Sequence, residues 1–335
     1  MFIASACSFH EGVLVDANVS AELDAWPYKR ELTINNMGLA AHADFALMVA
    51  LDSSRVRYST QGADLRFTDA NATMVLPHEI DRWNTAGRSI VWVRVPAIAA
   101  NATTTLWMYY GNAAAASAER PTDVWDQNYV GVWHLTDAHD SAGHNSSASN
   151  GAVPIDGPVG GAVRVFGQQY IDTGAADQLA TFTIEVWLNA ALPATTSNSS
   201  GPLSRGYNYQ MQWNCGDIQY CRSVNLVDQS GTVIAQYGNT LAAGTWHHVT
   251  ARYDGSVLET YVGDTRTGTA TAAGPPVAET GTAKLGARVN LAGYYSGDID
   301  EARISRVARS GDYLKAQHRA QTDTYLTFGP EQPNP

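Results

Sequence analysis

Apolar and polar residues alternate with a period of two along much of the chain. Between residues 249 and 254, Val, Ala and Tyr alternate with Thr, Arg and Asp, which is the pattern of a strand with one buried face. Asp254-Gly255 then supplies a turn, because Gly adopts positive φ freely and Asp tolerates it better than most residues. A second alternating run covers 257–262. The stretch from 244 to 264 therefore predicts a β-hairpin.

Short runs of apolar residues typical of strands also fill the first third of the chain. Strands are predicted over 26–36, 45–51, 64–69, 76–83, 89–96 and 104–110. The run 45–51 is almost wholly apolar, so we expect that strand to be buried on both faces or at an interface. Strands at this spacing, with no helical periodicity, indicate an antiparallel sandwich.

An Ala-rich segment, 113–121, closes with Pro121 and predicts a linker. Beyond it, strands are predicted over 129–135, 182–188 and 297–305, and a short helix over 312–318 with Ser310 or Asp312 as its cap. The predicted fold class is all-β, with two antiparallel β-sandwiches in tandem. The predicted divisions are a leader or tether (1–22), a first sandwich (23–126), a second sandwich (127–330) and a tail (331–335).

Charge narrows the range of partners. The 335 residues carry a net charge of −11, and only 16% of them are charged. Nucleic acid and anionic membrane surfaces bind clustered Lys and Arg, so neither is an expected partner. Neutral sugars or a bound cation suit this composition. No apolar run reaches the length of about 18 residues that a membrane-spanning helix needs, so we expect no membrane span.

Motifs in the second half resemble a known superfamily. The order W-H-H-V (246–249), Y-D-G (253–255) and Y-V-G-D (261–264) resembles the laminin-G-like modules of the concanavalin A-like lectin/glucanase superfamily. The likeness is to the bacterial modules that are secreted or displayed at the cell surface. This resemblance implies a jelly roll for the second sandwich and an extracellular or cell-surface location.

The first sandwich also resembles a family, over about residues 24–126. Its motifs are W-P-Y-K-R (26–30), D-L-R-F-T-D (64–69), L-P-H-E-I-D-R-W (76–83), V-W-V-R-V-P (91–96) and M-Y-Y-G-N (108–112). Together they resemble a bacterial domain of unknown function that commonly precedes laminin-G-like modules in exported proteins. The resemblance implies a β-sandwich and brings no activity with it.

Three cysteines bear on the compartment. Cys215 and Cys221 have five residues between them, and in an exported protein they predict a disulfide loop worth about 2 kcal/mol. A metal site is the weaker interpretation, because no second Cys pair accompanies them. Cys7 follows small residues in a stretch that resembles a bacterial lipobox, which makes it a candidate for lipidation. The alternative is a free thiol near the terminus.

Acidic residues raise the questions of catalysis and of metal binding. Glucanases of the superfamily carry three carboxylates on alternate positions of one strand. Here Asp298 and Asp300 share a face, whereas Glu301 is expected to point the other way and position 302 is Ala. The third carboxylate is missing, so we predict no catalysis at this strand.

Calcium is the better interpretation of some acids. Concanavalin A-like domains often hold one Ca²⁺ between an early loop and the last strand, so Asp140, Asp298 and Asp300 are its candidate ligands. The alternatives are a solvated acid or an Asp paired with Arg303 or Arg306.

A sugar site needs flat aromatic faces and hydrogen-bonding side chains. Around residues 207–214, alternation puts aromatic residues on one face and amides on the other. If the aromatic residues form the core, the amides become the site, and Tyr294 and Tyr295 supply a rim. The candidate ligand-binding residues are Tyr207, Tyr209, Gln210, Gln212, Trp213, Asn214, Tyr294 and Tyr295.

The sequence therefore predicts an exported or surface-attached carbohydrate-binding or adhesion protein, non-catalytic and stabilised by calcium. Its partner would be a polysaccharide or glycoconjugate, or else a cell-surface protein. One alternative is a polysaccharide-degrading enzyme, a glycoside hydrolase or lyase, with an unrecognised site. Another is a structural spacer in an envelope assembly.

Overall fold

A computed structural model describes residues 23–334 except 60, 192–200, 207, 214–221, 228–232, 239, 240, 273 and 292. For 213, 222–227 and 233–238 it gives the course of the backbone alone. Several predictions lie outside the described residues: the lipidation of Cys7, the Cys215–Cys221 disulfide, the ligand residues Tyr207 and Asn214, and the side chain of Trp213. No helix among the described residues is long and apolar enough to cross a membrane.

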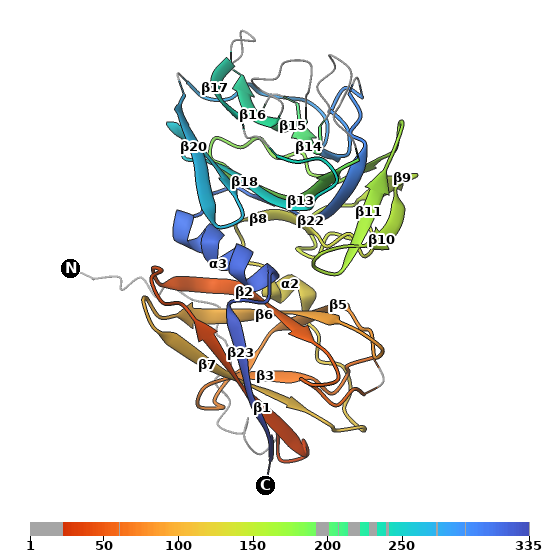
Figure 1. Ribbon diagram of the computed structural model, residues 1–335, viewed down its shortest axis with the longest axis vertical. Coiled ribbons are helices and arrows are strands. Elements are labelled where there is room, and N and C mark those ends of the chain that lie inside the picture. Colours follow the sequence, from red (N-terminus) through yellow and green to blue (C-terminus); the bar gives the residue numbers. More distant parts are fainter. Residues whose placement is uncertain are drawn as a thin grey trace, which may run out of the picture.

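The first sandwich packs two antiparallel sheets together (Figure 1). The β1 sheet has the order β23-β1-β7-β3-β4, and the β2 sheet has the order β2-β6-β5. The strands are β1 (Tyr28–Asn35), β2 (His42–Leu51), β3 (Arg66–Asp69), β4 (Val75–Leu76), β5 (His78–Arg82), β6 (Ser89–Ile98), β7 (Thr103–Tyr110) and β23 (Leu326–Pro333). Leu32 and Ile34 of β1 and Phe67 of β3 point into the shared core. The run from Phe45 to Leu51 is buried throughout, as its composition predicts.

The last strand of the chain belongs to the first sandwich. β23 pairs antiparallel with β1, from Ile34 opposite Leu326 to Tyr28 opposite Pro333. The division expected at residue 330 therefore cuts a strand, and the residues expected to form a tail are largely paired. The prolines hid this strand, because Pro cannot donate to a ladder and is tolerated in strands only at a sheet edge. β23 is such an edge, and the second sandwich is inserted between β7 and β23.

The second sandwich has an inner sheet, which faces the first sandwich, and an outer sheet at the far end of the molecule (Figure 1). The inner sheet comprises β10 (Val153–Asp156), β11 (Gly161–Val165), β22 (Gly297–Ser305), β13 (Phe182–Ala190), β18 (His247–Tyr253), β19 (Val257–Val262) and β20 (Thr265–Thr271), with β8 (Tyr129–Trp133) paired to β22. The outer sheet comprises β17 (Val233–Gly238), β16 (Arg222–Val227), β15 (Tyr209–Trp213), β14 (Leu203–Arg205), β21 (Lys284–Leu285), β12 (Tyr170–Asp172) and β9 (Ala148–Asn150). The predicted all-β fold of two antiparallel sandwiches is confirmed.

Two local predictions are also confirmed. β18 and β19 form the hairpin, with Gly255 at φ +98° in its turn. The predicted helix is α3 (Gly311–Gln321), and its cap is Ser310, whose hydroxyl accepts the Tyr313 N–H at 3.2 Å. A short helix, α2 (Pro121–Val124), begins at the last residue of the expected linker.

Helix α3 lies between the inner sheet and the β2 sheet (Figure 1). The Gln317 amide donates to the carbonyl of Ala46 on β2 at 3.0 Å and accepts from Arg303 on β22 at 2.8 Å. The ring of Tyr313 lies 5.3 Å from that of Phe45. One helix thus makes polar and apolar contacts with both sandwiches.

A β-bulge in β22 changes which side chains share a face. Glu185 lies opposite Arg303 and Trp187 lies opposite Asp300, so Val186 faces two residues, Glu301 and Ala302. Glu301 takes a φ of +49°, and its carboxylate bonds Arg303 on the side of the first sandwich. Ala302 fills the core position instead. The expectation that Glu301 points away from Asp300 is wrong, because strict alternation does not anticipate a bulge.

Candidate functional site

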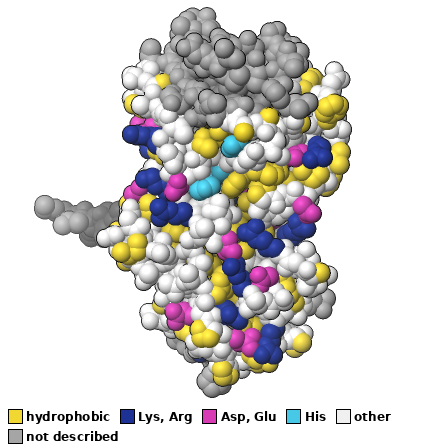
Figure 2. Space-filling view, viewed as in Figure 1, with side chains coloured by type: hydrophobic (Ala, Val, Ile, Leu, Met, Phe, Trp, Pro, Cys, Tyr) yellow, Lys and Arg dark blue, Asp and Glu magenta, His cyan; other side chains and the backbone are white. Residues whose placement is uncertain are grey.

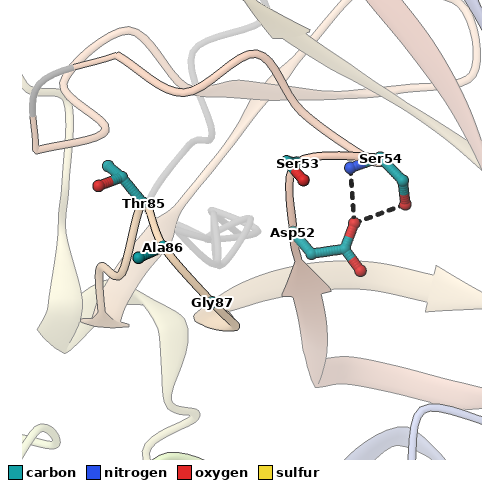
Figure 3. Close-up of a pocket in the computed structure, with 6 residues that line it drawn as sticks. All are labelled: Asp52, Ser53, Ser54, Thr85, Ala86 and Gly87. Carbon is teal, nitrogen blue, oxygen red and sulfur yellow. Dashed lines mark hydrogen bonds between the residues drawn. The ribbon is translucent and has the colours of Figure 1, made fainter.

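Two hollows in the described surface are lined mainly by polar side chains that already bond within the chain. The first, of about 380 Å³, lies between 52–54 and 85–87 on the first sandwich (Figure 3). The Asp52 carboxylate there accepts hydrogen bonds from the Ser54 N–H and hydroxyl and from the Arg55 N–H, at 2.5 to 3.2 Å. The carboxylate is thus used within its own loop, and the lining holds no aromatic ring.

The second hollow is a groove of about 620 Å³ beside α3 and the β19–β20 hairpin. Its basic side chains each have an acidic neighbour: Arg266 with Glu259 at 2.7 Å, Lys315 with Asp312 at 3.4 Å and Arg319 with Asp264 at 3.9 Å. On the face seen in Figure 2, Lys and Arg are likewise interspersed with Asp and Glu. The groove therefore offers no field of one sign that would attract a polyanion.

The face of the outer sheet that points away from the core carries a row of polar residues. Tyr209 and Met211 on β15 point into the core, so Gln210 lies on the opposite face. Along this face Asp172 lies opposite Lys284, Lys284 opposite Ser204, and Ser204 opposite Gln210. These four residues, here called the polar row, run across β12, β21, β14 and β15.

Hydrogen bonding differs between the two ends of the polar row. At one end the Lys284 ammonium donates to Asp172 and to the Thr282 hydroxyl, both at 2.7 Å, and that hydroxyl donates to Asp172 at 2.5 Å. Partial burial by itself raises the pKa of Asp172, but the hydrogen bonds from Lys284 and Thr282 hold the pKa below its usual value. At the other end, the Ser204 hydroxyl and both amide atoms of Gln210 are buried and make no hydrogen bond. That end of the row is closed to solvent, whereas the side chain of Asp172 is 37% exposed.

Two aromatic rings flank the end of the row near Asp172. Tyr170 lies two residues before Asp172 on β12 and hence on the same face. Its ring centre is 6.5 Å from that of Tyr294 at an interplanar angle of 42°, and both residues are half-buried. The Lys284 ammonium lies 5.9 Å from the centre of the Tyr170 ring. Flat aromatic faces beside carboxylate, amine and hydroxyl groups are suited to sugar rings.

The structure sorts the predicted ligand residues that it describes. Tyr209 and Tyr295 are fully buried core residues, so they do not contact a ligand at the surface, contrary to the prediction. The Tyr209 ring packs 5.8 Å from that of Phe182. Gln210 lies in the polar row but is buried, whereas Gln212 and Tyr294 are half-buried at the surface. The sheet puts the two glutamines on β15 and Tyr294 beside β12.

Sequence reasoning missed Tyr170, Asp172, Lys284 and Ser204. Alternation in Tyr170-Ile171-Asp172 and Ala283-Lys284-Leu285 does signal one polar face. The missing information was the pairing, because β12 and β21 are neighbours in the sheet although more than 100 residues separate them.

The predicted calcium ligands already have partners in the chain. The Asp140 carboxylate accepts from five donors, the N–H groups of Val132, Ala142, His144 and Asn145 and the Asn145 side-chain amide. These use its acceptor capacity and fix the loop after β8. Asp298 pairs with Arg164 through two bonds of 2.6 and 3.0 Å, rather than with Arg303 or Arg306. Asp300 accepts the Val159 N–H at 3.0 Å.

A buried polar cluster lies where the two sandwiches meet. His134, just after β8, bonds Glu301 through Nδ1 at 2.7 Å, and its Nε2 lies 3.5 Å from Glu79 of β5. Glu301 also accepts from Arg303 at 2.5 Å. Burial lowers the pKa of His134, but the negative charges of Glu301, Asp81 and Glu79 outweigh it and raise the pKa well above its usual value.

Aromatic rings enclose this cluster. The Trp92 ring of β6 stacks on His134 at 5.3 Å and 16°, and the Arg303 guanidinium lies 4.4 Å from the same ring. The Trp125 indole donates to Glu79 at 3.0 Å. We call Glu79, Asp81, His134, Asp300, Glu301 and Arg303 the interdomain cluster.

Two family models match the chain in succession. Residues 61–141 match a domain of unknown function (DUF2341), and residues 166–314 match the concanavalin A-like lectin/glucanases superfamily. The predicted arrangement, the first domain followed by a laminin-G-like module, is confirmed. The first match runs past the linker through β8, so it includes Glu79, Asp81 and His134 of the interdomain cluster.

Solved structures with a similar fold are distant. The binding domain of Paraclostridial Mosquitocidal Protein 1 is 12% identical, with 60% of this chain and 53% of that chain covered and a TM-score of 0.48. Domain 4 of an extracellular arabinanase from Geobacillus stearothermophilus, solved with arabinotriose, is 15% identical. The match covers 59% of this chain and 98% of that domain, with a TM-score of 0.45. The botulinum neurotoxin type G receptor binding domain is 10% identical, with 58% and 52% covered and a TM-score of 0.46. No curated protein matches the chain. These likenesses concern the fold and carry no argument about function.

Proposed function

We propose that the protein binds a polysaccharide or glycoconjugate through the outer face of its second sandwich. The observation that carries this proposal is the polar row, with Tyr170 and Tyr294 beside it. The rings would pack on sugar C–H faces, while Asp172 and Lys284 exchange hydrogen bonds with hydroxyls. Because this face lies at the far end of the molecule from the first sandwich (Figure 1), a long glycan meets no obstacle there from the first sandwich.

We further propose that binding is not followed by cleavage. Glycoside hydrolysis uses two carboxyl groups roughly 5 to 10 Å apart on either side of the bond to be cut. The polar row has one carboxylate, and Lys284 pairs with it. Asp300 and Glu301 are adjacent carboxylates, but both are buried between the sandwiches, where no sugar chain fits.

Affinity electrophoresis through gels containing a panel of polysaccharides tests the proposal. We expect one glycan class to retard the protein, because a row of fixed polar groups beside aromatic rings discriminates between sugars. Retardation without any release of reducing ends or unsaturated products would support binding without catalysis. Failure of every gel to retard the protein would overturn the proposal and favour a protein partner or a structural role.

Export and attachment to the cell surface are part of the proposal. They are supported by the two resemblances and by the stretch from Ile3 to Cys7. Labelling of cells with a radioactive or alkynyl fatty acid measures lipidation directly. We expect the label on the wild-type chain and none on a Cys7→Ser variant, and an unlabelled wild-type chain would contradict lipidation.

Calcium binding also stays a prediction. A Ca²⁺ ion in the loops of the second sandwich would tie segments together, so its removal should lower the melting temperature. The check is thermal unfolding with EGTA, followed by its removal and re-addition of Ca²⁺ alone; because EGTA also binds Zn²⁺, recovery with Ca²⁺ assigns the effect to calcium. An unchanged melting temperature would remove calcium from the account.

A further inference from the structure

We propose that the interdomain cluster binds one divalent transition-metal ion, Zn²⁺ foremost, through Asp81, His134 and Glu301. Asp81 lies on β5 of the first sandwich. In the second sandwich, His134 directly follows β8 and Glu301 lies on β22. One ligand atom from each lies within 4.8 Å of the others. An ion held by all three would join the two sandwiches directly. This inference is independent of the glycan face.

The charges of the cluster favour a cation. Four carboxylates, Glu79, Asp81, Asp300 and Glu301, surround a single histidine, and Arg303 is the permanent cation of the group. Without a bound ion, Arg303 and a protonated His134 bring two positive charges to these four carboxyl groups, and a divalent ion that replaces the His134 proton brings one more. Buried charge is costly unless it is paired or coordinates a metal. Asp300 and Glu301 are almost wholly inaccessible to solvent, so bulk water cannot compensate them.

Unused polar atoms are the second observation. His134 is 5% exposed, and its Nε2 lies 3.5 Å from Glu79. Asp81 Oδ2 and Asp300 Oδ1 are buried without a hydrogen-bond partner. Buried polar atoms of native proteins are nearly always paired, with an ion or water where no protein group serves. Two such carboxylate oxygens in one cluster point to a bound cation.

The donor set selects the kind of ion. One imidazole with carboxylates suits Zn²⁺ and its neighbours, whereas Ca²⁺ and Mg²⁺ take oxygen ligands. If His134 Nδ1 and Glu301 bind the ion, Nε2–H is left facing Glu79, and a carboxylate behind a metal-bound imidazole is the usual arrangement. Two ligands of tetrahedral Zn²⁺ lie about 3.3 Å apart. His134 Nδ1 and Glu301, now 2.7 Å apart, would have to separate by roughly half an ångström.

The backbone is adapted to this arrangement. The bulge in β22 and the positive φ of Glu301 turn its carboxylate toward His134. Bulges that re-aim a side chain occur preferentially beside functional sites. Gly160 admits the Asp81 carboxylate, because a Cβ at that glycine would lie 2.6 Å from Asp81 Oδ2.

Metal analysis of the full chain tests the proposal. The purified protein is dialysed against excess Zn²⁺, passed through a desalting column and analysed by inductively coupled plasma mass spectrometry. We expect about one equivalent of Zn²⁺, a lower melting temperature after treatment with 1,10-phenanthroline, and recovery on re-addition of Zn²⁺. Less than a tenth of an equivalent, with no shift on chelation, would overturn the inference.

Variants locate the ion. Asp81 is half-buried, so Asp81→Asn should fold, and we expect it to lose the bound Zn²⁺. The matched control is Asp156→Asn, which removes an exposed acid at the same boundary and should keep the ion. Zn²⁺ retained by Asp81→Asn would place it elsewhere and overturn the inference. If Asp81→Asn fails to fold, the wild-type metal content and the chelation shift still decide.

Discussion

At the scale of single residues, the boundary between the sandwiches is more polar than a protein core. Arg309 binds Asp126 through two bonds of 2.6 and 3.0 Å, and its guanidinium lies 4.4 Å from the centre of the Tyr129 ring. The Tyr129 and Tyr313 hydroxyls bond each other at 2.9 Å. Because these groups are buried, each depends on its partner in place of water.

The Asp126→Asn variant tests this dependence. It keeps the shape of the side chain but leaves the buried Arg309 guanidinium without its counter-charge, so we expect a loss of about 3 to 5 kcal/mol. Urea denaturation measures the change in the free energy of unfolding. Arg82→Gln breaks the more exposed Arg82–Asp156 pair and should cost less than about 1 kcal/mol. Equal losses in the two variants would contradict the account.

His78 on β5 predicts a dependence on pH. Burial, together with the positive charges of Arg66 and Arg120, lowers the pKa of His78 to about 4. The unfolded chain, with a His pKa near 6.5, takes up the proton first. The stability contributed by neutral His78 is therefore complete above about pH 6.5 and is lost as the pH falls toward 4.

The check compares the wild-type chain with His78→Gln in urea at several pH values. Between pH 7 and pH 5 we expect the wild-type chain to lose about 2 kcal/mol more than the variant. The difference between the two chains isolates His78, because every other titratable group is the same in both. Parallel pH profiles would show that His78 does not carry the effect.

At the scale of elements, the sequence predicts those whose pattern is local. The β18–β19 hairpin follows from alternation and one Asp-Gly turn, and α3 follows from its cap at Ser310. β23 was missed because Pro330 and Pro333 argue against a strand, and its place depends on a partner, β1, some 300 residues away. The direction of Glu301 was missed because a bulge resets the alternation. What escaped prediction was set by tertiary pairing.

Removal of β23 tests its assignment to the first sandwich. A chain ending at Tyr325 loses the hydrogen bonds between β1 and β23. It also exposes the apolar core side chains that Leu326 covers. We expect the amides of β1 to lose most of their protection from hydrogen exchange, while those of β13 and β18 keep theirs. Unchanged protection of β1 would mean that β23 contributes nothing to that sheet.

At the scale of the molecule, the chain forms two sandwiches with one nested in the other. It enters the second sandwich after α2 and returns through α3 to complete the first with β23 (Figure 1). Interdomain ion pairs and stacked rings fill the boundary, so we expect the two parts to unfold together. The inner sheet is occupied by this boundary, which leaves the outer sheet as the broad face of the second sandwich that the first sandwich does not cover.

The most direct test of the central claim is glycan binding by surface variants of the full chain. With the glycan identified by electrophoresis, isothermal titration would compare Tyr170→Ala, Tyr294→Ala and Trp107→Ala, the last a half-buried aromatic residue on the first sandwich. We predict that each tyrosine variant weakens binding at least tenfold, with an unchanged melting temperature, while Trp107→Ala binds as the wild-type chain does. Undiminished binding by both tyrosine variants would contradict a glycan site on the outer face.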